Sequence, residues 1–467
     1  MSLTHLKGKK FFVMGLGKTG LAAAKFLVNE LGCKVTAWDE KATARDAVPA
    51  NVQIQKPSQI HWPDFDGMVK SPGIPETQED VFAALAAGVK LWSDIDLAQF
   101  RAPEATYIAI TGTNGKSTTT ALIGHLLKDA GHAVEVGGNI GRPALDMPVL
   151  EKGGFYVLEL SSYQLLSVNE FRANVAVLIN ISADHMERHR TMEGYIAAKE
   201  RIFRNQEPSD LRVVGVDNYE LEQLTIALGL GVRLRRVSVT GVGADVTANN
   251  EGVMFDYDFT PPKRIYDLAK LTRLPGKHNW QNVVCAWAAV KDFMTIDQFV
   301  HGLESFGGLK HRLQRVLEHD GVIFRNDSKA TNADATIRAL DSVENIFLLA
   351  GGQAKAEGFV PCLDHLQNVK AIYLVGDAEE RFAQELAGVD IPVKRCGTIE
   401  KATAEAFKDA KAFAQNAQNK GQTPSVLLSP ACASWDQFDS FEHRGNVFIE
   451  TAYALCGLGQ PPEEEEE

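Results

Sequence analysis

Long hydrophobic runs are absent from the 467 residues of this chain. No stretch approaches the about 20 apolar residues of a membrane span, and residues 1–17 lack the apolar core of a signal peptide. Cysteine is scarce: six residues are scattered along the chain without a CxxC pair, which predicts reduced thiols. These absences predict a soluble protein of the cytoplasm that does not enter a membrane.

An excess of basic charge is also absent, since 48 Lys and Arg face 60 Asp and Glu and the net charge is −12. This balance argues against broad nucleic-acid binding, although local cations can still hold a small anionic ligand. Five glutamates end the chain, and residues 460–467 are expected to form a disordered tail. The length exceeds what one hydrophobic core usually covers, so two to four domains are expected.

Apolar strands alternate with helical stretches along the whole chain. Residues 9–40 contain a strand, a glycine turn, a helix with one apolar face and a second strand that ends at Asp39. Further strands are expected within residues 107–111, 155–162, 174–182, 321–328, 346–352, 371–376 and 425–430. Such alternation is typical of an α/β protein whose parallel sheets are covered by helices on both faces.

Two segments rich in turn formers or charge, residues 91–105 and 304–312, are the expected domain boundaries. They divide the chain into three α/β domains at residues 1–94, 95–307 and 308–467.

The stretch TGTNGKST, residues 111–118, joins an apolar strand to a helix. Gly112 and Gly115 allow the backbone to curl so that its N–H groups point inward, and Lys116 can then reach the β- and γ-phosphates of a nucleotide. Ser117 or Thr118 can offer a hydroxyl to Mg²⁺. The pattern predicts a nucleotide-binding loop rather than a turn without a ligand.

The loop is a shorter variant of the usual GxxxxGK[ST] spacing, because Ile110 stands where that spacing requires glycine. The strand within residues 155–162 carries Glu159 near its end, where a carboxylate on the magnesium side of a nucleotide site is expected.

A second glycine turn, GLGKTG, carries Gly15, Gly17 and Gly20 between a strand and a helix, with Asp39 about twenty residues further on. This GxGxxG pattern usually indicates NAD. The physics of the turn specifies only a diphosphate at a helix N-terminus, so a UDP-type substrate remains an alternative.

Further motifs follow in order along the chain. They are SPGI (71–74), GGNIG (137–141), LELSSYQL (158–165), DHMERH (184–189), YIAAKERIF (195–203), LPGKHNWQN (274–282), HRLQRV (311–316), NDSKATN (326–332), LAGGQAK (349–355) and LSPACASWDQF (428–438). With the two glycine loops they closely resemble the Mur ligases over essentially the whole chain. TGTNGKST alone fits any Mur ligase or a folylpolyglutamate synthetase, whereas NDSKATN and SPACASWDQF indicate the members that add D-glutamate.

The resemblance implies an N-terminal Rossmann-like domain that binds a UDP substrate, a central P-loop ATPase and a C-terminal Rossmann-like domain that binds an amino acid. It implies a monomer that uses ATP and two Mg²⁺ ions to join D-glutamate to UDP-N-acetylmuramoyl-L-alanine during peptidoglycan precursor synthesis. In the implied reaction ATP phosphorylates the alanyl carboxylate, and the amine of D-glutamate then displaces the phosphate to give an amide and ADP.

Phosphoryl transfer to a carboxylate brings two anions together, so cations must offset their repulsion. The implied catalytic residues are Lys116, Glu159, His185 and Lys199. By resemblance, Ser117 and Glu159 accompany the first magnesium ion, while His185 accompanies the second. The resemblance also implies that Lys199 is carbamylated and binds the second metal through its carbamate, which requires a lowered amine pKa.

The remaining contacts implied by the resemblance fall into three sets. The UDP substrate is expected to bind at Gly15, Leu16, Gly17, Lys18, Thr19, Asp39, Lys41, Gly73, Asn139 and His185. ATP is expected at Gly112, Thr113, Asn114, Gly115, Lys116, Ser117, Thr118, Asn279, Asn282, Arg312 and Asp327. D-Glutamate is expected at Lys329, Thr331, Lys355, Ser434 and Phe441. The sequence Asp-Glu-Lys at residues 39–41 departs from the Asp-Thr-Arg of one branch of the family, which leaves the uracil contacts open.

Three other functions compete with this interpretation. GLGKTG alone favours a nicotinamide-dependent oxidoreductase, and the phosphate loop alone fits an ATPase or switch module. Another amino-acid ligase of the Mur or folylpolyglutamate type is the nearest alternative. The Asp-Asn-Pro-Arg signature of diaminopimelate ligases is not found, and NDSKATN stands in its place.

Overall fold

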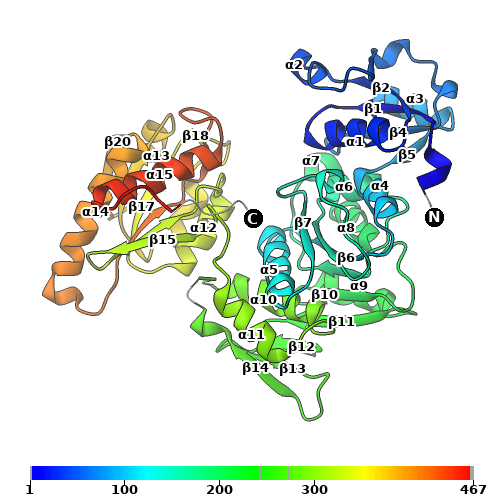
Figure 1. The fold of residues 1–467 in the computed structure, drawn as a ribbon. Helices are drawn as coiled ribbons and strands as arrows, with labels where there is room; N and C mark the ends of the chain where they lie inside the picture. The colour runs from blue at the N-terminus through cyan, green and yellow to red at the C-terminus, as the bar shows by residue number, and fades with distance from the viewer. Residues whose placement is uncertain (1–2, 242, 272, 275, 463–467) are drawn as a thin grey trace. The chain divides into compact units, whose positions relative to one another are not determined.

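The computed structural model describes residues 3–241, 243–271, 273–274 and 276–462 (Figure 1). The predicted tail lies, from residue 463 on, outside the described residues. The chain divides into two compact units, the first containing residues 1–269 and 278–306 and the second residues 270–277 and 307–467. Each unit is a mixed α/β structure, as predicted.

The first unit holds two sheets. The smaller, in the order β3-β2-β1-β4-β5, is parallel throughout and consists of β1 (Lys10–Met14), β2 (Lys34–Trp38), β3 (Gln53–Ile54), β4 (Gly67–Lys70) and β5 (Lys90–Trp92). Its accompanying helices are η1 (Leu3–Leu6), α1 (Lys18–Asn29), α2 (Ala42–Arg45), η2 (Pro57–Gln59), η3 (Trp62–Asp64), α3 (Glu79–Ala86) and α4 (Asp94–Arg101). The order in which strands are added to the sheet reverses between β1 and β4, since β2 and β3 follow on one side of β1 and β4 and β5 on the other. Ligands of open α/β sheets bind at such a switch point.

The larger sheet has the order β14-β13-β12-β11-β10-β9-β6-β8-β7 and is parallel except where β13 pairs with its two neighbours. Its strands are β6 (Thr106–Thr111), β7 (Val134–Gly138), β8 (Phe155–Glu159), β9 (Val175–Leu178), β10 (Leu211–Gly215), β11 (Arg233–Ser238), β12 (Val246–Ala248), β13 (Val253–Asp256) and β14 (Lys263–Asp267). Its helices are α5 (Lys116–Asp129), η4 (Ala144–Asp146), α6 (Ser162–Ser167), α7 (Met186–His189), α8 (Met192–Glu200), η5 (Arg201–Phe203), α9 (Tyr219–Leu228), η6 (Leu268–Lys270), α10 (Lys277–Val290) and α11 (Ile296–Ser305).

The segment 91–105, expected as a domain boundary, is an ordered part of the first unit. It forms the end of β5 and helix α4, which begins with a capping box between Ser93 and Asp96. Ile95 and Leu97 of this helix are fully buried in one apolar cluster that also contains residues of β1 and β6. The turn formers and charges of this segment therefore cap a helix inside a shared core, and the boundary at residue 94 remains a prediction.

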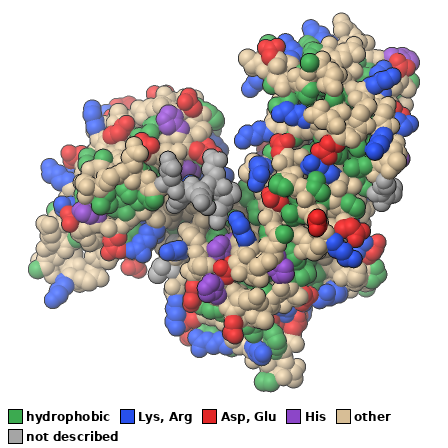
Figure 2. Space-filling model, viewed as in Figure 1, with side chains coloured by type: hydrophobic (Ala, Val, Ile, Leu, Met, Phe, Trp, Pro, Cys, Tyr) green, Lys and Arg blue, Asp and Glu red, His purple; other side chains and the backbone are tan. Residues whose placement is uncertain are grey.

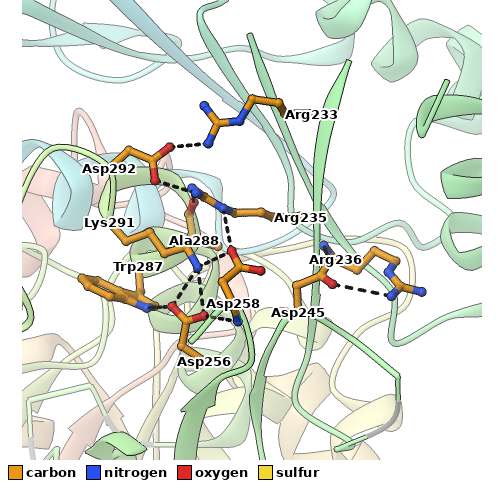
Figure 3. Close-up of polar contacts among 10 residues, drawn as sticks. All are labelled: Arg233, Arg235, Arg236, Asp245, Asp256, Asp258, Trp287, Ala288, Lys291 and Asp292. Carbon is orange, nitrogen blue, oxygen red and sulfur yellow. Dashed lines mark hydrogen bonds and ion pairs between the residues drawn. The ribbon is translucent and has the colours of Figure 1, made fainter. Parts of the chain in front are cut away.

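A buried polar network ties α10 to the larger sheet (Figure 3). The carboxylate of Asp256, which is fully buried at the end of β13, accepts hydrogen bonds from Lys291 Nζ at 2.9 and 2.8 Å and from Trp287 Nε1 at 2.8 Å. Arg235 of β11 pairs with Asp292 and donates to a carbonyl of the same helix. The network fixes the C-terminal half of α10, whose N-terminal half carries Asn279 and Asn282.

The second unit has a six-stranded sheet in the order β15-β16-β21-β17-β19-β20, in which only β15 is antiparallel, and a β18-β22 pair. The strands are β15 (Gln314–His319), β16 (Val322–Asn326), β17 (Ile346–Gly351), β18 (Gln353–Ala354), β19 (Val369–Val375), β20 (Val393–Gly397), β21 (Ser425–Leu428) and β22 (Cys432–Ala433). The helices are α12 (Ala333–Ser342), η7 (Val360–His365), α13 (Glu379–Glu385), α14 (Ile399–Gln415), η8 (Ala417–Asn419) and α15 (Phe441–Leu455). Separate apolar clusters under α12 and α13 and under α14 and α15 cover the two faces of the sheet.

Surface charge is mixed on the face shown in Figure 2, where Lys and Arg side chains alternate with Asp and Glu. No helix among the described residues has the length and apolar character needed to cross a membrane.

Candidate active site

The phosphate loop runs from the end of β6 to the first residue of α5. Gly112 and Gly115 have φ values of 154° and 81°, a region that favours glycine, and Gly115 caps the helix. Thr113 N donates to Asn180 O at 3.0 Å, and Asn114 N donates to Asn180 Oδ1 at 2.9 Å. Asn180, which follows the neighbouring strand β9, therefore shapes the loop, a role that the sequence analysis missed.

Gly115 lies directly against Asn282 of α10. A Cβ atom built on Gly115 would meet Asn282 Oδ1 at 2.0 Å, so a larger residue here requires the buried Asn282 side chain to shift. Asn282 Nδ2 donates to Asn279 Oδ1 at 3.0 Å, and both asparagines are buried. The structure thus brings the two residues expected at the adenine end of ATP next to the phosphate loop.

Lys116 folds back onto its own loop. Its Nζ donates to Gly112 O at 3.0 Å and to Thr113 O at 2.7 Å. Ser117 is 6% exposed and Thr118 is half-buried in the first turn of α5. The amine and the two hydroxyls therefore lie together at the N-terminus of one helix.

Lys199 is buried beneath the same loop, with only 1% of the residue exposed. Its Nζ donates to Gly112 O at 2.7 Å and lies 4.6 Å from the centre of the Tyr195 ring. Loss of solvent, reinforced by the charge of Lys116, lowers the pKa of Lys199 to about 7. Tyr195 itself contacts Thr113 through a 3.2 Å hydroxyl–hydroxyl hydrogen bond, so lysine, tyrosine and phosphate loop form one cluster.

Glu159 ends β8 and is 1% exposed. Its Oε1 accepts a hydrogen bond from Asn139 Nδ2 at 2.7 Å, while its Oε2 is buried and has no hydrogen-bond partner among the described residues. A buried carboxylate oxygen without a donor is costly unless a cation accompanies it. The orphaned oxygen therefore fits a bound metal ion.

His185 stands at the N-terminus of α7 with a left-handed φ of 55° and lies 5.0 Å from the Tyr163 ring. Four residues later His189 Nε2 contacts Ser162 Oγ at 3.0 Å, and burial, followed by the charge of His185, lowers the pKa of His189. The predicted metal residue His185 is half-buried, as is His189, which the sequence analysis did not consider. Among the described residues, no three His, Cys, Asp or Glu side chains form a ready-made metal site.

The first glycine turn is packed against the loop that follows β4. A Cβ on Gly15 would meet Ser71 Oγ at 2.4 Å, and one on Gly20 would meet Gly15 O at 1.9 Å. Leu16 N donates to Asp39 Oδ2 at 2.7 Å, so Asp39 caps the turn from β2. The turn and the SPGI segment therefore lie side by side at the switch point of the smaller sheet.

Several of the other residues predicted around the UDP substrate lie in this turn or in the segments next to it. Gly17 and Lys18 begin α1 and are exposed, Thr19 is half-buried, and Gly73 has open space around it. Lys41 N donates to Asp39 Oδ1 at 2.9 Å. Arg45, not predicted from the sequence, lies with its guanidinium 4.5 Å from the Trp38 ring centre, beside residues 39–41.

Two cations share the main-chain oxygen of Ile74. Lys70 Nζ, at the end of β4, donates to Ile74 O at 3.0 Å, and Arg188 Nη2 of α7 donates to the same oxygen at 3.3 Å. Burial lowers the pKa of Lys70 to about 8. Arg188 also lies 5.5 Å from the Tyr163 ring centre, so the SPGI segment is linked to the helix that follows His185. We call this arrangement the Ile74 clasp.

In the second unit, Asp327 follows β16 and accepts hydrogen bonds from Leu313 N at 3.0 Å and Ser429 Oγ at 2.8 Å. Burial raises its pKa to about 7, an effect that these two hydrogen bonds and Arg312 oppose. Arg312 is half-buried at the start of the same unit.

Arg444 of α15, which is 1% exposed, connects two of the segments that carry residues predicted for D-glutamate. Arg444 donates to Ser328 Oγ at 2.9 Å, Ser328 O at 2.7 Å and Cys432 O at 3.0 Å, so it joins the NDSKATN and SPACASWDQF segments. Lys329 Nζ lies 4.9 Å from the Phe441 ring centre, and Ser328 Oγ donates to Phe441 O at 2.8 Å. The sequence analysis missed this buried arginine. Of the other predicted residues, Thr331 is half-buried, Ser434 buried and Lys355 exposed.

Family models match both halves of the first unit. The Mur ligase middle domain matches residues 110–290, and the Mur ligase MurD-like N-terminal domain matches residues 9–93. With the α/β architecture and the phosphate loop, these matches define the class of the protein as the Mur ligases.

Curated relatives extend the similarity to nearly the whole chain. Proteins named UDP-N-acetylmuramoylalanine–D-glutamate ligase from Paramagnetospirillum magneticum and Caulobacter sp. strain K31 are 41% and 43% identical, and the matches cover 97% of this chain and 98% and 97% of those relatives. The solved structure of MurF ligase from Thermotoga maritima in complex with ADP shares the fold, with a TM-score of 0.56, 16% identity and coverage of 96% of each chain. The chain therefore belongs to the Mur ligase family, in its group of UDP-N-acetylmuramoylalanine–D-glutamate ligases.

Proposed function

We propose that this protein uses ATP to join D-glutamate to UDP-N-acetylmuramoyl-L-alanine, through an acyl phosphate, with release of ADP and phosphate. The observation that carries the proposal is the 41–43% identity, over 97% of the chain, to relatives of that name. The geometry of the phosphate loop and of the buried Lys199 and Glu159 supports it. In this proposal the enzyme acts in the cytoplasm as a monomer.

The phosphate loop supports the ATP half of the proposal. The curled backbone between Gly112 and Gly115 and the N-terminus of α5 favour an anion. Lys116, which donates to two loop carbonyls, exchanges these acceptors for phosphate oxygens when ATP binds. Its ammonium then offsets part of the repulsion between the γ-phosphoryl group and the carboxylate that attacks it.

The donor set also supports two magnesium ions. Glu159, with its orphaned oxygen, and Ser117 would hold one ion, and His185 and carbamylated Lys199 would hold the other. When bound, the ions supply positive charge beside the phosphoryl oxygens. Asn139 keeps Glu159 in place by donating to Oε1, and in the proposal it also contacts the muramoyl part of the substrate.

The UDP substrate binds, in this proposal, at the glycine turn of the smaller sheet, with its diphosphate over the N-terminus of α1. Leu16 N already donates to Asp39, so this carboxylate keeps the turn in its curled form. Gly73, with open space around it, leaves room for the substrate beside the SPGI segment.

The amino acid is assigned to the second unit. Lys329, Lys355, Thr331 and Ser434 can offer two ammonium groups and two hydroxyls to the two carboxylates of D-glutamate. Arg444 positions this set. It donates hydrogen bonds to the segment that carries Thr331 and to the segment that carries Ser434. Arg312 and Asp327 complete the proposed ATP contacts.

The test is ADP release by the purified protein with UDP-N-acetylmuramoyl-L-alanine, magnesium and one of D-Glu, L-Glu, L-Lys or diaminopimelate. We expect release only with D-Glu, and loss of release in a Lys116→Met variant. A matched control is Lys34→Met, since Lys34 is exposed at the amino end of β2, away from the carboxyl ends of the strands. Equal release with L-Glu would overturn the specificity, and release with no amino acid would favour an ATPase.

A further inference from the structure

A pocket of about 270 Å³ lies beside the glycine turn, between α1 and the segment from Gly141 to η4. Three cationic side chains, Lys18, Lys25 and Arg142, line it together with one acid, Asp146. The formal charge of the lining is therefore +2, in a chain whose net charge is −12.

The lysines of this pocket are available to a ligand. Lys18 and Lys25 are seven residues apart on α1, so they lie on the same face of the helix and about 10 Å apart along its axis. Both are exposed, and neither side-chain amine takes part in a hydrogen bond or ion pair within the described part of the chain. Arg142 has a single acid partner there, Glu135, at 3.3 Å, and remains largely exposed.

Arg101 connects the two walls of the pocket, which are α1 and the segment that contains η4. Arg101 of α4 donates to Leu145 O and Met147 O, both at 3.1 Å, on the η4 side. Its guanidinium also pairs with Glu30 at the end of α1. Arg101 thus joins both walls of the pocket, and the three cations line a cavity that is already formed. Binding of a ligand therefore costs little free energy for ordering the pocket.

We propose that Lys25 and Arg142, with Lys18, form an accessory site for the diphosphate of the UDP-linked substrate. The inference rests on the proposed function. It adds Lys25 and Arg142, which lie outside the GLGKTG and GGNIG motifs and have no role in the sequence analysis. The pocket starts at Lys18, the first residue of α1, where the helix N-terminus already favours phosphate, and it extends that positive region along the helix. Because the whole protein is acidic, this local field captures an anionic substrate that the net charge repels.

The test measures kcat and KM for the UDP substrate at about 25 mM and about 250 mM salt, since screening at the higher concentration shortens the reach of exposed charges. Lys25→Met and Arg142→Met are each expected to raise KM about threefold to tenfold at low salt, with the difference falling below about twofold at high salt. Arg142→Lys is expected to retain most of the affinity, and Lys34→Met is the matched exposed control.

Calorimetric titration with UDP and with inorganic diphosphate provides a second measurement that does not depend on turnover. Weaker binding of both probes to the Lys25 and Arg142 variants supports the site. Wild-type affinity for both probes, together with an unchanged KM at low salt, overturns it. If instead the wild-type protein binds UDP but releases no ADP with any amino acid, the proposed function fails while the pocket stands.

Discussion

Carbamylation of Lys199 is the prediction that tests the chemistry most directly. The pKa of its amine falls from 10.5 to about 7, which corresponds to about 5 kcal/mol at 1.36 kcal/mol for each power of ten. At pH 7.5 about three-quarters of this amine is neutral, compared with about one in a thousand for an ordinary lysine. Only the neutral amine attacks CO₂, so burial under Gly112 prepares Lys199 for the reaction.

The assay is ¹³C NMR of the magnesium-loaded protein in ¹³C-labelled bicarbonate. We expect one carbamate resonance that disappears in a Lys199→Arg variant, whose guanidinium stays protonated. ADP release should fall in CO₂-free buffer and recover when bicarbonate is added, and the variant should lose at least about a hundredfold in kcat.

Lys70 is the matched control for this experiment. It is also buried, and its pKa is lowered to about 8, but it lies in the Ile74 clasp and is not a predicted metal residue. Lys70→Arg should leave the carbamate resonance unchanged. A bare amine at Lys199 in active, metal-loaded enzyme would refute the reasoning.

Three further predictions concern the site, and one concerns the packing behind it. Glu159→Gln should lower magnesium-dependent ADP release about 10- to 100-fold without changing the circular dichroism spectrum, because the orphaned oxygen loses its charge. Gly115→Ala should lower the free energy of unfolding by about 1–3 kcal/mol in urea titrations, since the position has a positive φ and faces a side-chain oxygen. Asp256→Asn should cost about 1–3 kcal/mol by the same measurement, because it removes the fully buried one of the two carboxylates that pair with Lys291 and leaves only Asp258. The raised pKa of Asp327 means that the folded state binds a proton more tightly than the unfolded state, so its contribution to stability is lost as pH rises from about 4 to about 7. Asp327→Asn should remove that part of the pH dependence, and an unchanged slope would contradict the assignment.

Local sequence signals predicted the architecture well. Near-continuous apolar strands gave the parallel sheets, and paired glycines marked both turns, because a positive φ and close backbone approach restrict those positions to glycine. Family resemblance then supplied the remaining candidate residues, whose roles are still predictions.

Contacts that depend on tertiary packing could not be predicted from local sequence signals. From its local sequence, Lys199 has the pattern of an ordinary lysine on a helix. Only the fold places its amine against the carbonyl of Gly112, which lies 87 residues earlier in the chain. Asn180 and Arg444 likewise act through partners far away in the chain. In the segment 91–105, a charged residue and a turn former cap helix α4, so the local sequence alone does not decide whether a domain boundary lies there.

The Ile74 clasp has a consequence for how this enzyme can change over generations. Its acceptor is a peptide carbonyl, so replacing the Ile74 side chain does not remove the acceptor from either cation. Substitution of Lys70 or Arg188 by a residue without a hydrogen-bond donor, in contrast, removes one of the two donors to this carbonyl. If an inhibitor bound to this carbonyl, a substitution at residue 74 would therefore leave the contacted group in place.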